Sequence, residues 1–143
     1  MLIGEFLIQK KLITEGQLVA GLKRHFQSHL KIGECLILDG SIEEKVLLMA
    51  LSELLDIAYF DEIPLHLITE DSMTLFPLRM ATNLCVIASE SENKMGFMVF
   101  CNDQLDEVKA HILLSDAKAT IGLAKKSHIR QAIDKVYVQK HMQ

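Results

Sequence analysis

The chain has 143 residues, 50% of them hydrophobic and 24% charged, with a mean hydropathy of +0.22, so intrinsic disorder is excluded. Its net charge of −4 includes no excess of lysine and arginine to neutralise a phosphate backbone, which argues against a nucleic acid polymer as partner. The apolar share is high for a lone domain and predicts a surface covered by a partner or by a second copy in a homo-oligomer.

An internal repeat is the main feature of the first part of the chain. A shift of 29 residues places Ile3–Ile8 over Ile32–Ile37 and gives nine identities over positions 3–25. The shared residues are aliphatic at helical spacing, apart from one glycine and two glutamates in each copy. Repeats of this length form stacked helical units. We therefore expect two tandem helical hairpins over residues 1–60.

The second copy carries signals for the end of one helix and the start of the next. Gly40 is expected to end a helix over 30–39, because glycine adopts the left-handed conformation without a Cβ penalty. Ser41 and Glu44 have the spacing of a capping box, which predicts that the next helix begins there.

The first copy has the same helix signals with one difference. Thr14–Gln17 is expected to form the equivalent capping box, but Lys11 replaces the glycine and predicts a different stop. The side chains expected to line the buried face of the following helix are Leu18, Leu22 and Phe26.

The composition changes after Tyr59, and Asp61–Pro64 is expected to be a connector because proline restricts the residue before it. The later segments alternate between helical and strand-like patterns. We expect helices over 69–75, 104–114 and 127–138, the last capped by Ser127, and strands over 84–88, 96–101 and 118–123. The predicted fold class is α+β, with a helical lobe over 1–60 and a small β-hairpin/α/β/α lobe over 61–143.

Cysteine usage and the terminus predict a cytoplasmic protein. Cys35, Cys85 and Cys101 are odd in number and form no CxxC pair, which favours reduced thiols over a disulfide framework or zinc site. The N-terminus lacks the basic start of a signal peptide, and the longest apolar run, 46–55, is too short to cross a bilayer. We therefore expect no direct membrane insertion.

The repeat also carries a resemblance to a known family. The pattern Ile-Gly-x-x-Leu-x(5)-Ile-x(4)-Leu-x(3)-Leu occurs twice and resembles the N-terminal regulatory (MshEN-like) domain of type II secretion and type IV pilus assembly ATPases. Later segments resemble the same domain in the same order, and these are 56–61, 75–77, 84–87, 103–106 and 127–137. The resemblance spans nearly the whole chain.

The family implies two functions, and departures from its motif bear on the choice. Some members bind cyclic di-GMP through the tandem repeat, and others dock the ATPase onto a membrane-anchored assembly protein. The arginines that open the family repeat are Leu2 and Lys31 here, and the closing glutamines are His25 and Leu54. Arginine grips phosphate through two parallel bonds, which lysine and leucine do not. We therefore expect a non-catalytic docking or regulatory module, with a secretion or pilus assembly protein or a signalling protein as partner.

The alternative is a cyclic di-GMP receptor, and no other cofactor is expected. The resemblance and the repeat nominate nine residues for that site, and these are Ile3, Gly4, Leu7, Lys31, Ile32, Gly33, Leu36, Gly40 and Asp103.

Catalysis has little support in the sequence. The Gly-x(4)-Gly-Lys-Ser/Thr phosphate loop of ATPases is missing. His25 and His29 have the spacing to share a metal on a helix, but no third ligand lies near them in sequence. Cys101 lies close to Asp103 without an assigned histidine base, and Ser127–His128 is better explained as a helix start. We expect neither an enzyme nor a metal site.

Overall fold

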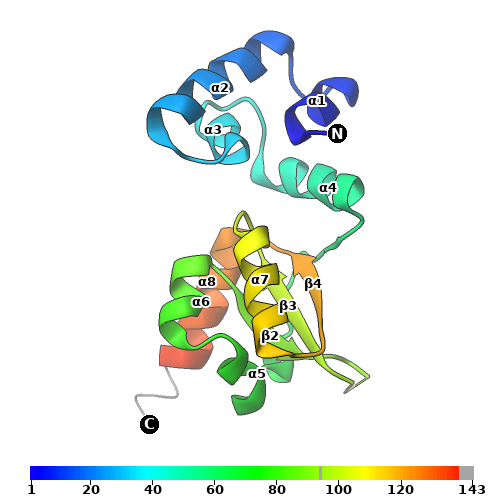
Figure 1. Cartoon of the computed structure of the whole chain (residues 1–143), viewed down its shortest axis with the longest axis vertical. Coiled ribbons are helices and arrows are strands. Elements are labelled where there is room, and N and C mark those ends of the chain that lie inside the picture. The colour runs from blue at the N-terminus through cyan, green and yellow to red at the C-terminus, as the bar shows by residue number, and fades with distance from the viewer. Residues whose placement is uncertain (94, 139–143) are drawn as a thin grey trace. The chain divides into compact units, whose positions relative to one another are not determined.

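The computed structural model describes residues 1–93 and 95–138 and divides the chain into two compact units, Met1–Ile57 and Ala58–Gln143 (Figure 1). The first unit is helical and the second combines helices with a sheet, so the α+β class expected from the sequence is confirmed. The helical lobe expected over residues 1–60 includes residues 58–60. In the structure, Ala58 and Tyr59 form a strand in the sheet of the second unit.

The first unit contains two helices from each repeat, and these are α1 (Ile3–Gln9), α2 (Glu15–Ser28), α3 (Ile32–Leu38) and α4 (Glu44–Leu55). In each repeat, a glycine of the first helix lies against a leucine of the second helix. A Cβ on Gly4 would lie 2.7 Å from Leu18 Cδ1, and a Cβ on Gly33 would lie 2.9 Å from Leu47 Cδ2. Helices also pack across the repeats, because α2 contacts α3 and α1 contacts α4. The two hairpins are therefore interleaved.

The first helix of each repeat ends in the same turn. Gly40 has a φ of 74°, and the N–H groups of Gly40 and the next residue donate to the carbonyls of Ile37 and Leu36. This is the Schellman arrangement. Lys11 has a φ of 61° and the equivalent two hydrogen bonds form in the first repeat. The prediction of a different stop at Lys11 is wrong, because the two hydrogen bonds hold a lysine in the left-handed conformation as well.

The second helix of each repeat begins at an equivalent position. Thr14 forms the predicted capping box, in which its hydroxyl accepts from the Gln17 N–H and the Gln17 side chain accepts from the Thr14 N–H. The capping box predicted at Ser41 is wrong, and Glu43 is the N-cap residue of α4. Ser41 instead belongs to the turn that ends α3 and Ile42 is buried, so the helix starts only after them.

The core of the first unit is formed by buried residues that mostly recur at the repeat spacing, namely Leu7, Ile13, Leu36, Ile42, Leu47 and Ala50. Phe26 was expected on the buried face of α2, but its side chain is 73% exposed. The buried residue of α2 is Gly21, where a Cβ would lie 2.9 Å from Leu36 Cδ2. Phe26 follows five residues later and points about 140° away around the helix.

Within its described residues, the second unit contains a four-stranded sheet, five segments of α-helix or 3₁₀-helix, and a closing π-helical turn. In chain order these are β1 (Ala58–Tyr59), η1 (Leu65–Leu67), α5 (Glu70–Leu75), α6 (Leu78–Leu84), β2 (Ile87–Glu90), β3 (Phe97–Cys101), α7 (Leu105–Ser115), β4 (Ala119–Leu123), α8 (Lys126–Ile133) and η2 (Asp134–Val138). The strand order is β1-β4-β3-β2. The predicted hairpin of β2 and β3 is confirmed, and α7 is the crossover that the parallel pair β3 and β4 requires.

Two boundaries in this unit differ from the sequence-based expectation. The strand expected over 84–88 begins only at Ile87, because α6 runs to Leu84 and ends with Cys85 at a φ of 51°. Ser127 does not cap the last helix, whose N-cap residue is Lys125. Ala124 still donates a backbone hydrogen bond within the sheet, so a single residue separates the sheet from α8.

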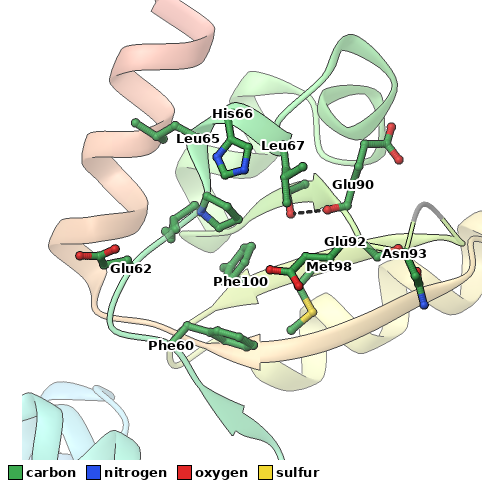
Figure 2. A pocket seen from close by; sticks show the side chains of 14 residues that line it. Phe60, Glu62, Leu65, His66, Leu67, Glu90, Glu92, Asn93, Met98 and Phe100 are labelled. Atoms are coloured by element: carbon green, nitrogen blue, oxygen red, sulfur yellow. Dashed lines mark hydrogen bonds between the residues drawn. The ribbon is translucent and has the colours of Figure 1, made fainter.

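One face of the sheet carries an open groove of about 990 Å³ (Figure 2). Met98 and Phe100 of β3 line the groove, whereas Phe97 lies on the opposite face with His111 of α7. This follows from the alternation of side chains along a strand. The walls of the groove are the segment after β1 and the loop between β2 and β3.

Candidate functional site

Six of the nine residues nominated for a dinucleotide site lie in α1 and α3, at equivalent positions of the two repeats, and they are Ile3, Gly4, Leu7, Ile32, Gly33 and Leu36. Leu7 and Leu36 are fully buried, and the two isoleucines pack against the same core. The two glycines allow the close approach of a leucine from the next helix. These residues therefore contribute to the interior packing of the unit, and their side chains present few groups that a ligand at the surface could contact.

The other three nominated residues lie at two places. Lys31 immediately precedes α3 and Gly40 follows it, and both are exposed. A Cβ on Gly40 would meet no atom within 4 Å, so its positive φ is what favours glycine there. Asp103 belongs to the second unit, where its Oδ2 lies 3.0 Å from Lys126 Nζ. The repeat thus supplies one cationic side chain from the nominated set.

The positions at which the sequence departs from the family motif have different surroundings. Leu2 is the N-cap residue of α1 and is 73% exposed. His25 is half-buried, and its Nδ1 forms a hydrogen bond with the Leu30 carbonyl. Leu54 is half-buried on α4. Hydrophobic groups thus stand at two of the four positions, and one polar group is already bound within the chain.

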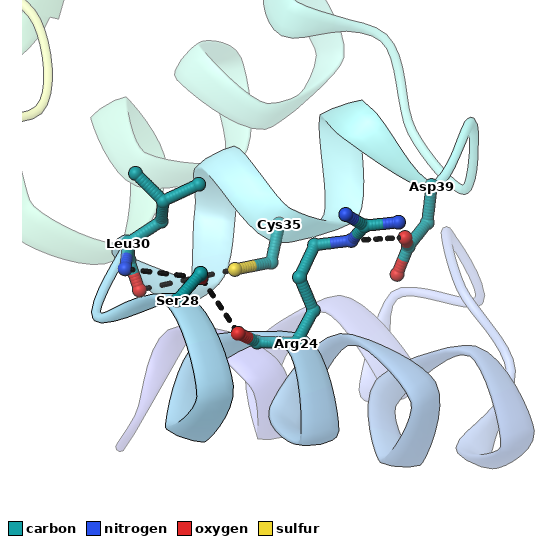
Figure 3. Close-up of polar contacts among 5 residues, drawn as sticks. All are labelled: Arg24, Ser28, Leu30, Cys35 and Asp39. Atoms are coloured by element: carbon teal, nitrogen blue, oxygen red, sulfur yellow. Dashed lines mark hydrogen bonds and ion pairs between the residues drawn. The ribbon is translucent and has the colours of Figure 1, made fainter.

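A polar network holds the connection between α2 and α3 (Figure 3). The Ser28 hydroxyl donates to the Arg24 carbonyl at 2.6 Å and accepts from the Leu30 N–H at 3.2 Å. The Cys35 thiol donates to the Leu30 carbonyl at 3.8 Å. This network fixes the backbone directly before Lys31 and so fixes the start of α3.

Two ion pairs that the sequence-based expectations do not include join the repeats. Arg24 Nε lies 2.6 Å from Asp39 Oδ1, and Lys10 Nζ lies 2.6 Å from Glu53 Oε1. A shift of 29 residues places Lys10 on Asp39 and Arg24 on Glu53, with the charges exchanged. The signal was therefore present in the repeat, but a search for identical residues passes over positions of opposite charge.

The floor of the groove in the second unit is aromatic and apolar. The rings of Phe60 and Phe100 meet edge to face, with centroids 5.3 Å apart, and Met98 lies beside them (Figure 2). Gly122 of β4 leaves the space for this arrangement, because a Cβ there would lie 2.4 Å from Phe60 Cε2 and 2.9 Å from Met98 Cε. From the sequence, Met98 stands out as a residue beside a possible edge strand, whereas Phe60, Phe100 and Gly122 are not candidates for a site.

The rim of the groove is acidic. Glu62 lies in the segment after β1, and Glu90 and Glu92 lie at the end of β2 and in the following loop. The Glu90 carboxylate accepts a hydrogen bond from the Thr69 hydroxyl at 2.8 Å. Within the described part of the chain, the residues that line this groove include no lysine or arginine. The groove therefore combines an apolar floor with negative charge at its edges.

The groups considered for catalysis or metal binding are held in structural roles. Burial, with a smaller contribution from nearby Cys85, raises the pKa of the Cys101 thiol to about 12, so the thiol stays protonated at neutral pH. His25 is bound to Leu30, and His29 is the left-handed residue that ends α2. Among residues 1–93 and 95–138 the structure contains no group of three or more histidine, cysteine, aspartate or glutamate side chains placed to hold a metal ion.

The length and polarity of the helices bear on membrane insertion. Within the described residues, no helix is both long enough and apolar enough to cross a bilayer.

Comparison with known proteins identifies the fold. The sequence matches no protein-family model, and a search of curated proteins finds no match. A solved structure of MshE with cyclic di-GMP is similar at a TM-score of 0.77 and 22% sequence identity, over 96% of this chain and 99% of that chain. A structure of the N-terminal domain of XpsE is similar at a TM-score of 0.69 and 15% identity, over 93% and 92%. The chain therefore has the fold of these two proteins, and the fold implied by the family resemblance is confirmed.

Proposed function

We propose that this chain is a non-catalytic, cytoplasmic docking or regulatory module of the kind that the N-terminal domains of secretion and pilus ATPases provide. Its partner would be a secretion or pilus assembly protein or a signalling protein. The observation that carries the proposal is the likeness of fold to MshE and to the N-terminal domain of XpsE over at least 92% of all three chains.

Docking is favoured over nucleotide binding by the chemistry of the repeat. The two places where the family has arginine are occupied by Leu2 and Lys31. Leucine makes no hydrogen bond to phosphate, and lysine lacks the planar fork that binds two phosphate oxygens at once. His25 stands at one glutamine position and already bonds the Leu30 carbonyl. The repeat therefore keeps the packing residues of a dinucleotide site and few of its polar contacts.

A cyclic di-GMP receptor is the second candidate, and the observation in its favour is the ligand of MshE. In that case Lys31 would contact a phosphate, and the exposed backbone at Gly40 would approach the ligand closely. Ile3, Gly4, Leu7, Ile32, Gly33 and Leu36 would hold the two helix starts in place. Asp103, which pairs with Lys126, is the nominated residue that lies in the second unit.

Isothermal titration with cyclic di-GMP at physiological salt tests the two candidates against each other. The docking function predicts no heat and an unshifted melting curve at high ligand concentration. Binding in the low micromolar range would support the receptor instead, and Lys31→Ala would then abolish it without changing the melting temperature. The matched control is Lys23→Ala, an exposed lysine of α2 in the same unit.

Site-specific photocrosslinking in cells tests docking itself. A benzophenone side chain would be placed at Phe26 in the first unit and, separately, at Leu114 in the second, since both positions are exposed. An adduct identified by mass spectrometry as a secretion, pilus or signalling component would support the proposal. Adducts with abundant unrelated proteins alone, at both positions, would contradict it.

A further inference from the structure

We infer that the acidic groove of the second unit is a docking site for a segment of a partner protein that carries apolar side chains flanked by lysines or arginines. This inference rests on the proposed docking function and specifies the chemistry of the partner. It concerns residues that lie outside the tandem repeat, so it is independent of whether the repeat binds a nucleotide.

The apolar floor of the groove predicts apolar anchors on the partner. Phe60 directly follows β1, Met98 and Phe100 belong to β3, and all three line the same opening (Figure 2). Phe100 is almost fully buried, whereas Phe60 and Met98 remain half-exposed. Aromatic rings provide large rigid contact areas, and the flexible thioether of methionine adapts to different side chains. Burial of leucine-like or aromatic anchors against this floor would therefore drive association.

The charge of the rim predicts that the anchors are flanked by cations. Glu62 borders the opening on one side and Glu90 borders it on the other, with both carboxylates turned away from the floor, and Glu92 lies in the hairpin loop beside Glu90. Figure 2 shows the Glu92 side chain extending from the hairpin loop toward Phe100. Carboxylates at the edge of an interface attract a basic partner and disfavour an acidic one, because like charges brought together are costly. The hydrogen bond from Thr69 holds Glu90 in place at this edge.

The dimensions of the groove can accommodate a protein segment. Its volume of about 990 Å³ is at the upper end of the range for small-molecule pockets, which is roughly 300–1,000 Å³. The opening is bordered along one side by residues 62–67 and along the other by the hairpin loop. An amphipathic helix placed between such walls presents its anchors every three or four residues to the floor.

The test uses the full chain and three labelled 14-residue peptides that share one amphipathic pattern. The probe contains leucine and lysine, one control replaces every lysine by glutamate, and the other replaces every leucine by serine. Fluorescence anisotropy at physiological salt should detect binding of the leucine–lysine peptide only. Equal binding of the serine–lysine peptide would show that charge alone is responsible and would overturn the inference, as would the absence of any binding.

Two protein variants locate the binding. Glu62→Gln combined with Glu92→Gln should weaken the binding of the leucine–lysine peptide by about tenfold, since each rim charge contributes modestly. The matched control, Asp106→Asn combined with Asp116→Asn, removes two exposed charges at the two ends of α7, which packs on the other sheet face. It should change affinity by less than about twofold. Equal weakening by both variants would mean non-specific attraction and would overturn the inference.

The NMR signals of methionine methyl groups report directly on peptide binding at the floor of the groove. Titration of the leucine–lysine peptide should shift the Met98 methyl signal and leave that of Met49, an exposed residue of α4, unchanged. A shift at Met49 without one at Met98 would place the peptide elsewhere and overturn the inference. Docking through another surface would still stand in that case, whereas the cyclic di-GMP titration and the crosslinking test the docking function separately.

Discussion

The two repeats of the first unit have the same internal packing and different polar surfaces. Gly4 and Gly33 each receive a leucine of the next helix, and Leu7 and Leu36 are both fully buried. By contrast, the capping residue is threonine in one repeat and glutamate in the other, and the ion-pair positions carry opposite charges. Close-packed interiors tolerate few changes of shape, whereas surface polar groups contribute little individually. The interior of the repeat is therefore the part that the fold requires.

The exchanged charges also favour the way in which the repeats pair. The observed pairs, Lys10 with Glu53 and Arg24 with Asp39, each join a residue of one repeat to a residue of the other. Pairing of the same positions within a single repeat would bring Lys10 to Arg24 and Asp39 to Glu53, and both contacts would be repulsive. The charge pattern thus supports the interleaved packing of the four helices.

The largest effect is expected at the glycine contacts that the repeats share. Gly33→Leu should lower the free energy of unfolding by about 1–3 kcal/mol, because the new side chain meets Leu47 in a closely packed contact. Gly16→Ala is the control, since its nearest neighbour is 3.9 Å away, and it should raise stability by up to about 1 kcal/mol. Urea unfolding followed by circular dichroism measures both. A neutral Gly33→Leu variant would mean that α3 does not pack against α4 in solution.

Removal of the capping side chain should lower the stability of the two repeats by different amounts, and this effect should be somewhat smaller than that of the glycine substitution. Thr14→Ala removes a reciprocal capping box and should cost about 1 kcal/mol. Glu43→Ala at the equivalent position should change stability by less than about 0.5 kcal/mol, because the Glu43 side chain makes no cap hydrogen bond to the described residues. Chemical denaturation of the two variants side by side checks the difference. Equal losses would show that Glu43 caps α4 in solution.

The residues at the turns that end α1 and α3 can be exchanged, lysine for glycine in one turn and glycine for lysine in the other. Lys11→Gly should stabilise the protein and Gly40→Lys should destabilise it, each by roughly 1 kcal/mol, because a residue with a Cβ is strained at these φ values of 61° and 74°. Thermal unfolding should show melting temperatures that move in opposite directions by about 3 °C. Shifts in the same direction would contradict the equivalence of the two turns.

The smallest effect is expected at the ion pairs. Lys10→Glu should destabilise the unit, and addition of Glu53→Lys should restore it, with a coupling of about 0.2–1 kcal/mol because both side chains are largely exposed. A double-mutant cycle by thermal unfolding measures the coupling, which should fade in about 1 M NaCl as the Debye length falls to about 3 Å. Coupling that persists at high salt would indicate contacts other than electrostatic attraction.

Local signals predicted much of the chain correctly. The capping residue Thr14, the left-handed Gly40 and the β2–β3 hairpin follow from neighbouring residues alone, and the structure has them. Errors arose where two local signals compete. Ser41 has the spacing of a capping box, but its N–H is bound by the end of the preceding helix, so the tertiary position of Ile42 sets where α4 begins.

The repeat, the α+β class and the resemblance to secretion and pilus ATPase domains could be read from the sequence, because they depend on periodicity and on residue types a few positions apart. The groove in the second unit could not be predicted from the sequence. Phe60, Met98 and Gly122 lie in different strands or loops, and they meet only because β1 pairs with β4 and β4 pairs with β3. Such contacts depend on strand order and register, which no local pattern specifies. The sequence by itself determined the helical repeat and its core, and the tertiary structure decided how the repeats pair and where the groove lies.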